Sequence, residues 1–353
     1  MNNKFLYTLL TLCSVVLFVS CEMDDNEPIL NQSISRLYVS YSEYNPDVQQ
    51  QAVQNVRVIT NSDSTVFGEG KLATSFVSPA HGGGTIHFHP AARYVFHSSS
   101  NVGRADTNIY SLQVGETGGL KVGGKIANEK LTNIRGLVFH PSLDKLYSVR
   151  VTNDSSLVYV FNLPRGINRH VHPSQTFVIA ENRNIWDAAI WKSELYLSRS
   201  GENGGVDVYS ELVTTRDTLL LNQEPRVALT IAGTQNIRGM SLDTVNNMLA
   251  VTDFSSAGGE TKGRVLLFEN FSELAASTGT ISPTRVIEGA TTGLQQPVDV
   301  DLDFREGSEF LYVADAQARK VFRFKKADSG DVAPDQVYEN GLTPISLSLD
   351  ARD

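Results

Sequence analysis

One unit recurs six times along the chain, and it restricts the fold more than any other feature. Each copy is a short strand that ends on His, Asp or Trp, followed by a turn and a second strand that begins Leu-Tyr or similar. The first strands of the copies occupy residues 85–89, 136–140, 187–191, 239–243, 299–303 and 346–350. Their ends lie between 47 and 60 residues apart. This spacing is typical of a β-propeller, whose four-stranded blades take roughly 40 to 50 residues each.

The sixth copy lacks a second strand, because the sequence stops at Asp353. A suitable strand stands at the other end of the chain, at residues 37–40, and another follows at 56–59. We therefore predict that the C-terminal strand joins the blade begun by the N-terminus, which removes two open sheet edges. The predicted fold is all-β, a six-bladed β-propeller over residues 35–353 with N-/C-terminal overlap closure of one blade. We interpret residues 258–263 and 271–276, within the longest interval, as an insertion rather than a seventh blade.

The N-terminus has the order of a secretory signal. Lys4 precedes an apolar run from Phe5 to Val19, which is shorter than the roughly 20 residues that a membrane-spanning helix needs. Residues 18–21, Phe-Val-Ser-Cys, resemble a bacterial lipobox. The resemblance implies that residues 1–20 are a signal peptide, that Cys21 carries lipid, and that residues 21–34 form an acidic linker. A plain secretory signal is the alternative.

These features predict an outer membrane lipoprotein. The acidic residues 22–27 are similar to the sorting signal of lipoproteins that reach the cell surface, and a solvated linker is the alternative. Cys13 and Cys21 are the only cysteines, so the processed chain would have no thiol for a disulfide or a metal. A net charge of -9 without a basic run argues against nucleic acid and favours a neutral, cationic or protein partner.

The repeat also carries a family resemblance. Residues 296–303, 311–316 and 321–324 of the last full copy resemble an NHL-type repeat. The same pattern is similar to a wider group of six-bladed propellers that includes gluconolactonase-like hydrolases. These hydrolases hold a divalent cation such as calcium in the channel, so the resemblance makes Asp187, Asp299 and Asp301 candidate metal ligands. The family's first-blade Glu has no counterpart here, because Ser346 and Ser348 stand in the first blade.

The alternation along each innermost strand separates two sets of residues. One set is apolar throughout and should pack between blades, whereas the other set is small or polar and should face the channel. Just before these strands, Asn-Ile-Arg-Gly occurs at residues 133–136 and again at 236–239. This repetition places Arg135 and Arg238 at matching positions, and Trp186 occupies that position in the blade between them.

We therefore expect a ring of polar side chains around one channel mouth, able to hold a polar ligand or a peptide. The candidate ligand-binding residues are Asn133, Arg135, Arg150, Asn184, Trp186, Asp187, Arg199, Asn236, Arg238, Asp253, Gln296, Asp299 and Asp315. Tyr41 and His97 end strands on the same face and are expected beside them. The alternative is that these residues cap turns or form internal ion pairs.

The sequence contains no complete catalytic motif. The leading hypothesis is therefore a non-enzymatic envelope lipoprotein without a cofactor, whose channel mouth binds a protein or glycan partner. The alternative is a metal-dependent, lactonase-like hydrolase acting in the channel. A structural component of an envelope assembly shares the features of the first hypothesis, and the oligomeric state is not determined by the sequence.

Overall fold

A computed structural model describes residues 33–47, 51–100, 106–152, 155–181, 183–257 and 260–353. Residues 34–352 form one compact unit. The predicted signal peptide, Cys21 and nearly all of the linker lie outside the described residues. Among the residues that are described, no helix has the length and apolar character needed to cross a membrane.

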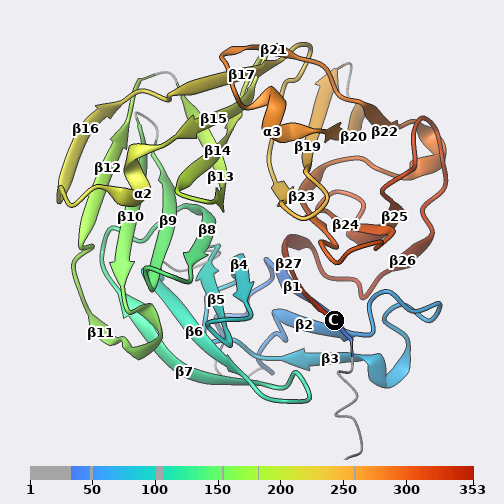
Figure 1. Cartoon of the computed structure of the whole chain (residues 1–353). Coiled ribbons are helices and arrows are strands. Elements are labelled where there is room, and N and C mark those ends of the chain that lie inside the picture. Colours follow the sequence, from blue (N-terminus) through green and yellow to red (C-terminus); the bar gives the residue numbers. More distant parts are fainter. Residues whose placement is uncertain (1–32, 48–50, 101–105, 153–154, 182, 258–259) are drawn as a thin grey trace, which may run out of the picture. The chain divides into compact units, whose positions relative to one another are not determined.

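Six sheets surround a central channel, which confirms the predicted six-bladed propeller (Figure 1). We number the blades 1 to 6 and give the strands of each from the channel outward. Blade 1 contains β27 (Pro344–Arg352), β1 (Ile34–Tyr41), β2 (Val56–Thr60) and β3 (Ala73–Phe76). Blade 2 contains β4 (Gly83–His89), β5 (Tyr94–Ser99), β6 (Asn108–Val114), β7 (Leu120–Ala127) and β11 (Asn168–His170). Blade 3 contains β8 (Ile134–His140), β9 (Lys145–Val151), β10 (Ser156–Asn162), β12 (Gln175–Ile179) and β16 (Leu219–Gln223).

The second half of the ring follows the same plan. Blade 4 contains β13 (Asn184–Trp191), β14 (Glu194–Ser200), β15 (Gly205–Tyr209), β17 (Val227–Ile231) and β21 (Gly279–Ile281). Blade 5 contains β18 (Met240–Asp243), β19 (Met248–Ala257), β20 (Glu260–Glu269) and β22 (Arg285–Glu288). Blade 6 contains β23 (Pro297–Leu302), β24 (Phe310–Asp315), β25 (Lys320–Lys325) and β26 (Gln336–Tyr338). The helical segments are short: α2 (Glu211–Thr214), α3 (Phe271–Leu274), η1 (Gly70–Leu72), η2 (Pro164–Gly166) and η3 (Ala290–Thr292).

Blade 1 closes the ring as predicted. The C-terminal strand β27 is the innermost strand of this blade and pairs antiparallel with the N-terminal strand β1, from Ile34 opposite Arg352 to Tyr41 opposite Pro344. The insertion in blade 5 is a long hairpin of β19 and β20 followed by α3, and it adds no blade.

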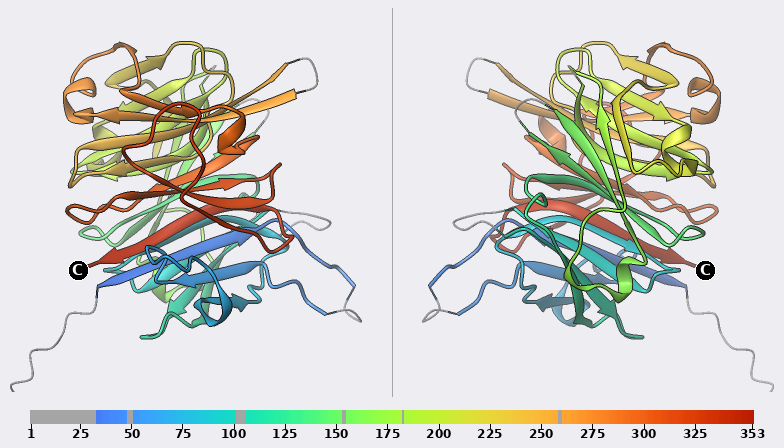
Figure 2. Two further views of the ribbon diagram at one scale, coloured as in Figure 1. Left: turned by 90° about the vertical axis from the view of Figure 1, so that its right-hand side faces the viewer. Right: turned by 90° about the vertical axis from the view of Figure 1, so that its left-hand side faces the viewer.

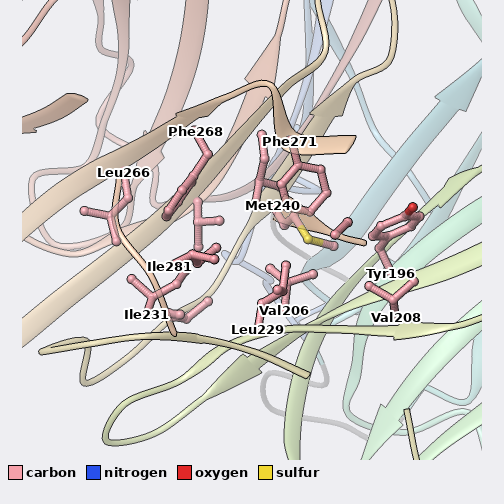
Figure 3. Packing of buried hydrophobic residues seen from close by; sticks show 14 of the residues in the cluster. Tyr196, Val206, Val208, Leu229, Ile231, Met240, Leu266, Phe268, Phe271 and Ile281 are labelled. Carbon is pink, nitrogen blue, oxygen red and sulfur yellow. The ribbon is translucent and has the colours of Figure 1, made fainter. Parts of the chain in front are cut away.

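The core lies between the blades. Apolar residues of the inner strands, such as Ile86, Leu137, Val300 and Leu347, are buried as the alternation predicts. Figure 3 shows one such contact, in which Val206 and Leu229 of blade 4 pack with residues of blade 5. The blade-5 residues shown there include Met240, Leu266, Phe268 and Phe271. Packing of apolar faces between neighbouring blades therefore stabilises the ring.

Three blades have a fifth strand that the sequence did not reveal. The strands β11, β16 and β21 each precede the fourth strand of one blade but pair in parallel with the fourth strand of the previous blade. An isolated parallel bridge from Gly330 to Ile287 repeats this arrangement between blades 6 and 5. Neighbouring blades are thus joined at their outer edges as well as through the core.

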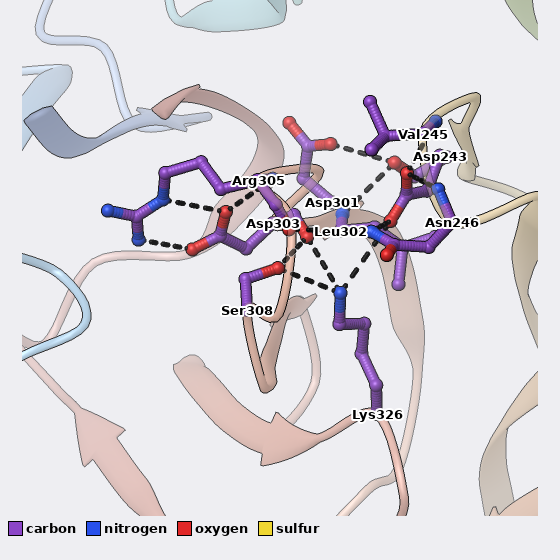
Figure 4. Close-up of polar contacts among 10 residues, drawn as sticks. Asp243, Val245, Asn246, Asp301, Leu302, Asp303, Arg305, Ser308 and Lys326 are labelled. Atoms are coloured by element: carbon purple, nitrogen blue, oxygen red, sulfur yellow. Dashed lines mark hydrogen bonds and ion pairs between the residues drawn. The ribbon is translucent and has the colours of Figure 1, made fainter. Parts of the chain in front are cut away.

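A polar network joins blades 5 and 6 (Figure 4), and Arg305 extends it to blade 1. The Lys326 ammonium group donates to the backbone oxygen of Asp303 at 2.9 Å and lies 3.6 Å from Oδ2 of Asp243. Arg305 pairs with Asp303 and, at 2.7 Å, with Asp63 of the segment between β2 and β3. This network supports the junction where the two ends of the chain meet.

The two faces of the propeller differ in what they carry. β1 begins and β27 ends on one side, whereas the β19–β20 hairpin projects on the opposite side (Figure 2). We call the side on which the inner strands begin the start face, and the side on which they end the end face. Because Ile34 pairs with Arg352, the chain enters the propeller at the end face.

The inner strands of blades 5 and 6 approach each other closely at Gly239. A Cβ at this position would overlap Cα and Oδ1 of Asp299 in the next blade, whereas a Cβ at Gly279 would meet nothing within 4 Å. We expect Gly239→Ala to destabilise the protein by about 1 to 3 kcal/mol, as overpacking does. Gly279→Ala should change the stability by less than about 0.5 kcal/mol. Thermal unfolding of both variants measures the difference, and equal melting temperatures would contradict the account.

Candidate functional site

Polar side chains in the channel accept hydrogen bonds from backbone N–H groups of the next blade. Oδ2 of Asp187 accepts from the N–H of Met240 at 2.9 Å, and Oδ2 of Asp301 accepts from the N–H of Leu349 at 2.7 Å. In five further contacts of this kind, a backbone N–H donates to a side chain of the preceding blade: Leu302 to Ser241, Leu347 to Asp299, Ile86 to Ser346, Phe88 to Ser348 and Phe139 to His87. The inner strands are edge strands, so these N–H groups would otherwise lack a protein partner.

We call this set of contacts the capping belt, and its register shows how the inner strands run. Asp299 and Asp301 cap Leu347 and Leu349 in the same order, so β23 and β27 lie parallel. Blade 3 donates to the belt through Phe139 but contributes no acceptor side chain among the described residues, and Gly136 lets the backbone of Asp187 approach there. The small and polar residues predicted to face the channel therefore connect neighbouring blades.

Burial changes the acid–base properties of the belt. It raises the pKa of Asp187 to about 7 and the pKa of Asp301 to about 6. Burial, together with the negative charge of Asp187, also raises the pKa of Asp299 well above its usual range. His87 has its pKa lowered to about 3 by burial, so its ring is neutral and can accept the N–H of Phe139. The carboxyl groups in the channel therefore hold protons more tightly than exposed aspartates.

A cavity of about 500 Å³ occupies the channel. Its wall includes Asp187, Asp299 and Asp301, and it continues to His89 and Trp191 where the inner strands end. None of the amide or arginine side chains predicted for the mouth at the start face lines this cavity, and neither does Trp186. The cavity therefore belongs to the end face.

The three aspartates do not fit a divalent cation as they stand. Within the described parts of the chain, no group of three His, Cys, Asp or Glu side chains is placed to hold a metal. Calcium takes six to eight oxygen ligands, and all six carboxylate oxygens of this trio already accept hydrogen bonds from the protein. These residues are therefore explained by the capping belt.

At the start face, Arg135, Trp186 and Arg238 come together from three successive blades. The guanidinium carbon of Arg135 lies 4.4 Å from the centre of the Trp186 ring, and that of Arg238 lies 3.8 Å from it. Arg238 also lies 5.2 Å from the ring of Phe254. We call these four residues the arginine–aromatic stack. The repeated Asn-Ile-Arg-Gly sequence is therefore the local origin of a cation–π arrangement.

Hydrogen bonds hold one arginine of the stack and leave the other free. Arg238 donates to Oγ of Ser200 at 2.6 Å and to Oδ1 of Asn236 at 3.5 Å. Arg135 makes no hydrogen bond or ion pair with the described residues, and its side chain is exposed. Burial and the positive charge of Arg135 lower the pKa of Arg238 to about 10. The stack thus contains two positive charges close together, neither of them paired with a carboxylate of the described chain.

Several other predicted ring residues serve the fold. Arg199 pairs with the buried Asp207, and Asp253 pairs with Arg264. Asp315 accepts hydrogen bonds from three backbone N–H groups of nearby turns. These residues therefore make the internal ion pairs and turn-capping contacts of the alternative interpretation.

The remaining residues of the predicted ring are of two kinds: some are buried in the fold, and others have few or no side-chain contacts with it. His97 and Tyr41 were expected at the mouth, but both are buried, and His97 bonds to serine hydroxyl groups. Arg150 donates to the hydroxyl of Tyr159 at 3.3 Å and forms no ion pair within the described chain. The side chains of Asn133, Asn184 and Gln296 form no hydrogen bond with the described residues.

Two residues of the mouth were missed by the sequence analysis. Ser200 ends β14 and holds Arg238, and Phe254 in β19 extends the stack. Each directly follows a residue that was predicted to lie at the mouth, Arg199 and Asp253 respectively. The alternation of side chains along a strand was therefore the available signal, because the residue after a fold-facing arginine or aspartate points the other way.

Comparison with known proteins supports the fold and does not extend to a family. No protein-family model matches the chain, and no curated protein matches it. A solved structure of a candidate 6-phosphogluconolactonase from Bacteroides fragilis is similar, with a TM-score of 0.54 and 11% identity over 92% of this chain and 100% of that chain. AztD from Citrobacter koseri has a TM-score of 0.45 and 8% identity, covering 91% of this chain and 99% of its own. At this identity, the similarity to the first structure shows the propeller fold alone.

The capping belt predicts a pH dependence that one substitution should alter. Because the pKa of Asp301 is raised to about 6, its contribution to stability is full below about pH 4 and is lost as the pH rises through 6. Asp301→Ser should keep a cap, since Ser348 caps Phe88 in the same way. The buried His87 and His97 act in the opposite sense, so the comparison is with the wild type.

We expect the melting temperature of Asp301→Ser, relative to that of the wild type, to increase from pH 4.5 to pH 7.5. Thermal unfolding at constant ionic strength measures this difference. A difference between variant and wild type that is the same at both pH values would contradict the assigned role of Asp301.

Proposed function

We propose that this protein is a non-enzymatic outer membrane lipoprotein whose start-face mouth binds a protein or glycan partner. The single observation that carries the proposal is the arginine–aromatic stack. It gathers at one mouth two guanidinium groups that form no ion pair with a described carboxylate. A cluster of uncompensated charges is a better candidate for binding than residues whose charges are already paired within the fold.

The entry point of the chain supports this proposal. Lipid on Cys21 would tether the protein to a membrane through the residues before Ile34. The chain enters the propeller at the end face, so the attachment of this tether would not cover the start face. The 14 residues from Cys21 to Ile34 span at most about 50 Å when fully extended, at 3.3–3.6 Å per residue. The start mouth would then be the one open to partners in the surroundings.

A hydrolase acting in the channel receives less support. The three aspartates cap backbone groups, and they do not converge on a cation site among the described residues. The similarity to a candidate lactonase is one of fold. No specific observation therefore favours the catalytic alternative over the binding role.

Photo-cross-linking in intact cells tests which mouth meets a partner. We expect a benzoylphenylalanine at Asn184, which is exposed at the start face, to give a specific cross-linked product. The matched control is the same residue at Ser193, which is exposed in the turn after β13 at the end face. Products are detected by immunoblotting and identified by mass spectrometry.

The comparison between the two positions decides the outcome. A product from Asn184 and none from Ser193 supports the proposal. Equal products from both positions, or a product from Ser193 alone, would show that the start mouth is not the binding face.

A further inference from the structure

We propose that the start mouth binds the carboxylate groups of an acidic oligosaccharide through Arg135 and Arg238. This inference rests on the proposed binding function and names the chemistry of the ligand. It reverses the expectation of a neutral or cationic partner, which followed from the net charge of -9.

Three arginines of the mouth form no ion pair with a described carboxylate, although the chain as a whole carries a net charge of -9. Most of the arginines that the structure describes pair with a carboxylate, as Arg183 and Arg199 both do with Asp207. Arg135, Arg150 and Arg238 form no ion pair among the described residues; the first two lie in the adjacent strands β8 and β9 of blade 3, and Arg238 directly precedes β18 of blade 5. An anionic ligand would supply the missing negative charge.

The stack prepares the guanidinium groups for such a ligand. A guanidinium that lies over an aromatic ring keeps its N–H donors in the plane of the group, where they can bind a carboxylate with two hydrogen bonds. Ser200 and Asn236 fix the position of Arg238, which reduces the conformational entropy lost on binding.

The remaining mouth residues favour a sugar over a protein surface. Asn133, Asn184 and Gln296 offer amide donors and acceptors that suit hydroxyl groups. Trp and Arg are also common in protein interfaces, but there they lie in a patch core that is more apolar than the remaining surface and depleted of charged residues. The exposed large apolar residues of the described chain are Val66, Val77, Val122, Leu143, Leu163, Leu219, Leu221, Val245 and Val337, and none of them belongs to the mouth.

Calorimetric titration of the purified full-length protein in detergent tests this inference. The probes are trigalacturonate, maltotriose as a neutral trisaccharide, and a glutamate-rich peptide. We expect trigalacturonate to bind, its affinity to fall with added NaCl, and maltotriose not to bind. Arg135→Gln and Arg238→Gln should each weaken trigalacturonate binding about tenfold or more. The matched control is Arg216→Gln, because Arg216 is exposed and distant in the fold from the mouth, and it should leave the affinity unchanged.

Thermal unfolding of each variant confirms that it is folded. Equal binding of maltotriose, unchanged affinity in both mouth variants, or binding of the peptide without trigalacturonate would each overturn the inference. A cross-link from Asn184 without trigalacturonate binding would leave the proposed function in place and remove only the oligosaccharide. Conversely, trigalacturonate binding without a cross-link in cells would support the ligand chemistry and contradict the envelope partner.

Discussion

The unpaired edges of the six inner strands are the constraint on which the rest of the structure depends. A propeller places these strands around a channel. The N–H groups on the channel side of each strand have no further strand to pair with. Short acceptors on the neighbouring blade solve this problem, as Asp301 does for Leu349. Close approach of the blades also requires glycine at Gly239, beside Asp299. The channel is therefore polar for structural reasons, and its buried carboxyl groups pair with the backbone.

This constraint separates residues that hold the ring from residues that are available for a ligand. The capping belt and the polar network at blades 5, 6 and 1 hold neighbouring blades together. The arginine–aromatic stack belongs to neither of them, and its guanidinium groups form no ion pair with a described carboxylate. It also lies on the face opposite the point where the chain enters the propeller. The binding proposal follows from this separation.

The sequence predicted the fold because the alternation along the inner strands is local and repeated six times. Ring closure was predictable too, since one strand was missing at each end of the repeat. Fifth strands such as β21, with three residues, gave no local pattern, because they form only against a blade that is distant in sequence. Some residues of the predicted ring form ion pairs within their own blade. Arg199 pairs with Asp207 across the β14–β15 hairpin, and this contact depends on a strand register that the sequence pattern does not show. Net charge says nothing of where charges gather, because it sums over the whole chain.

The chain has only two tryptophans, and they report on the two mouths separately: Trp186 in the stack and Trp191 in the wall of the end-face cavity. Fluorine NMR of protein labelled with 5-fluorotryptophan should therefore give one resonance for each mouth, assigned with Trp191→Phe. The account predicts that trigalacturonate shifts the Trp186 resonance and leaves that of Trp191 in place. A shift of the Trp191 resonance alone would place the binding site in the end-face cavity and contradict the central claim.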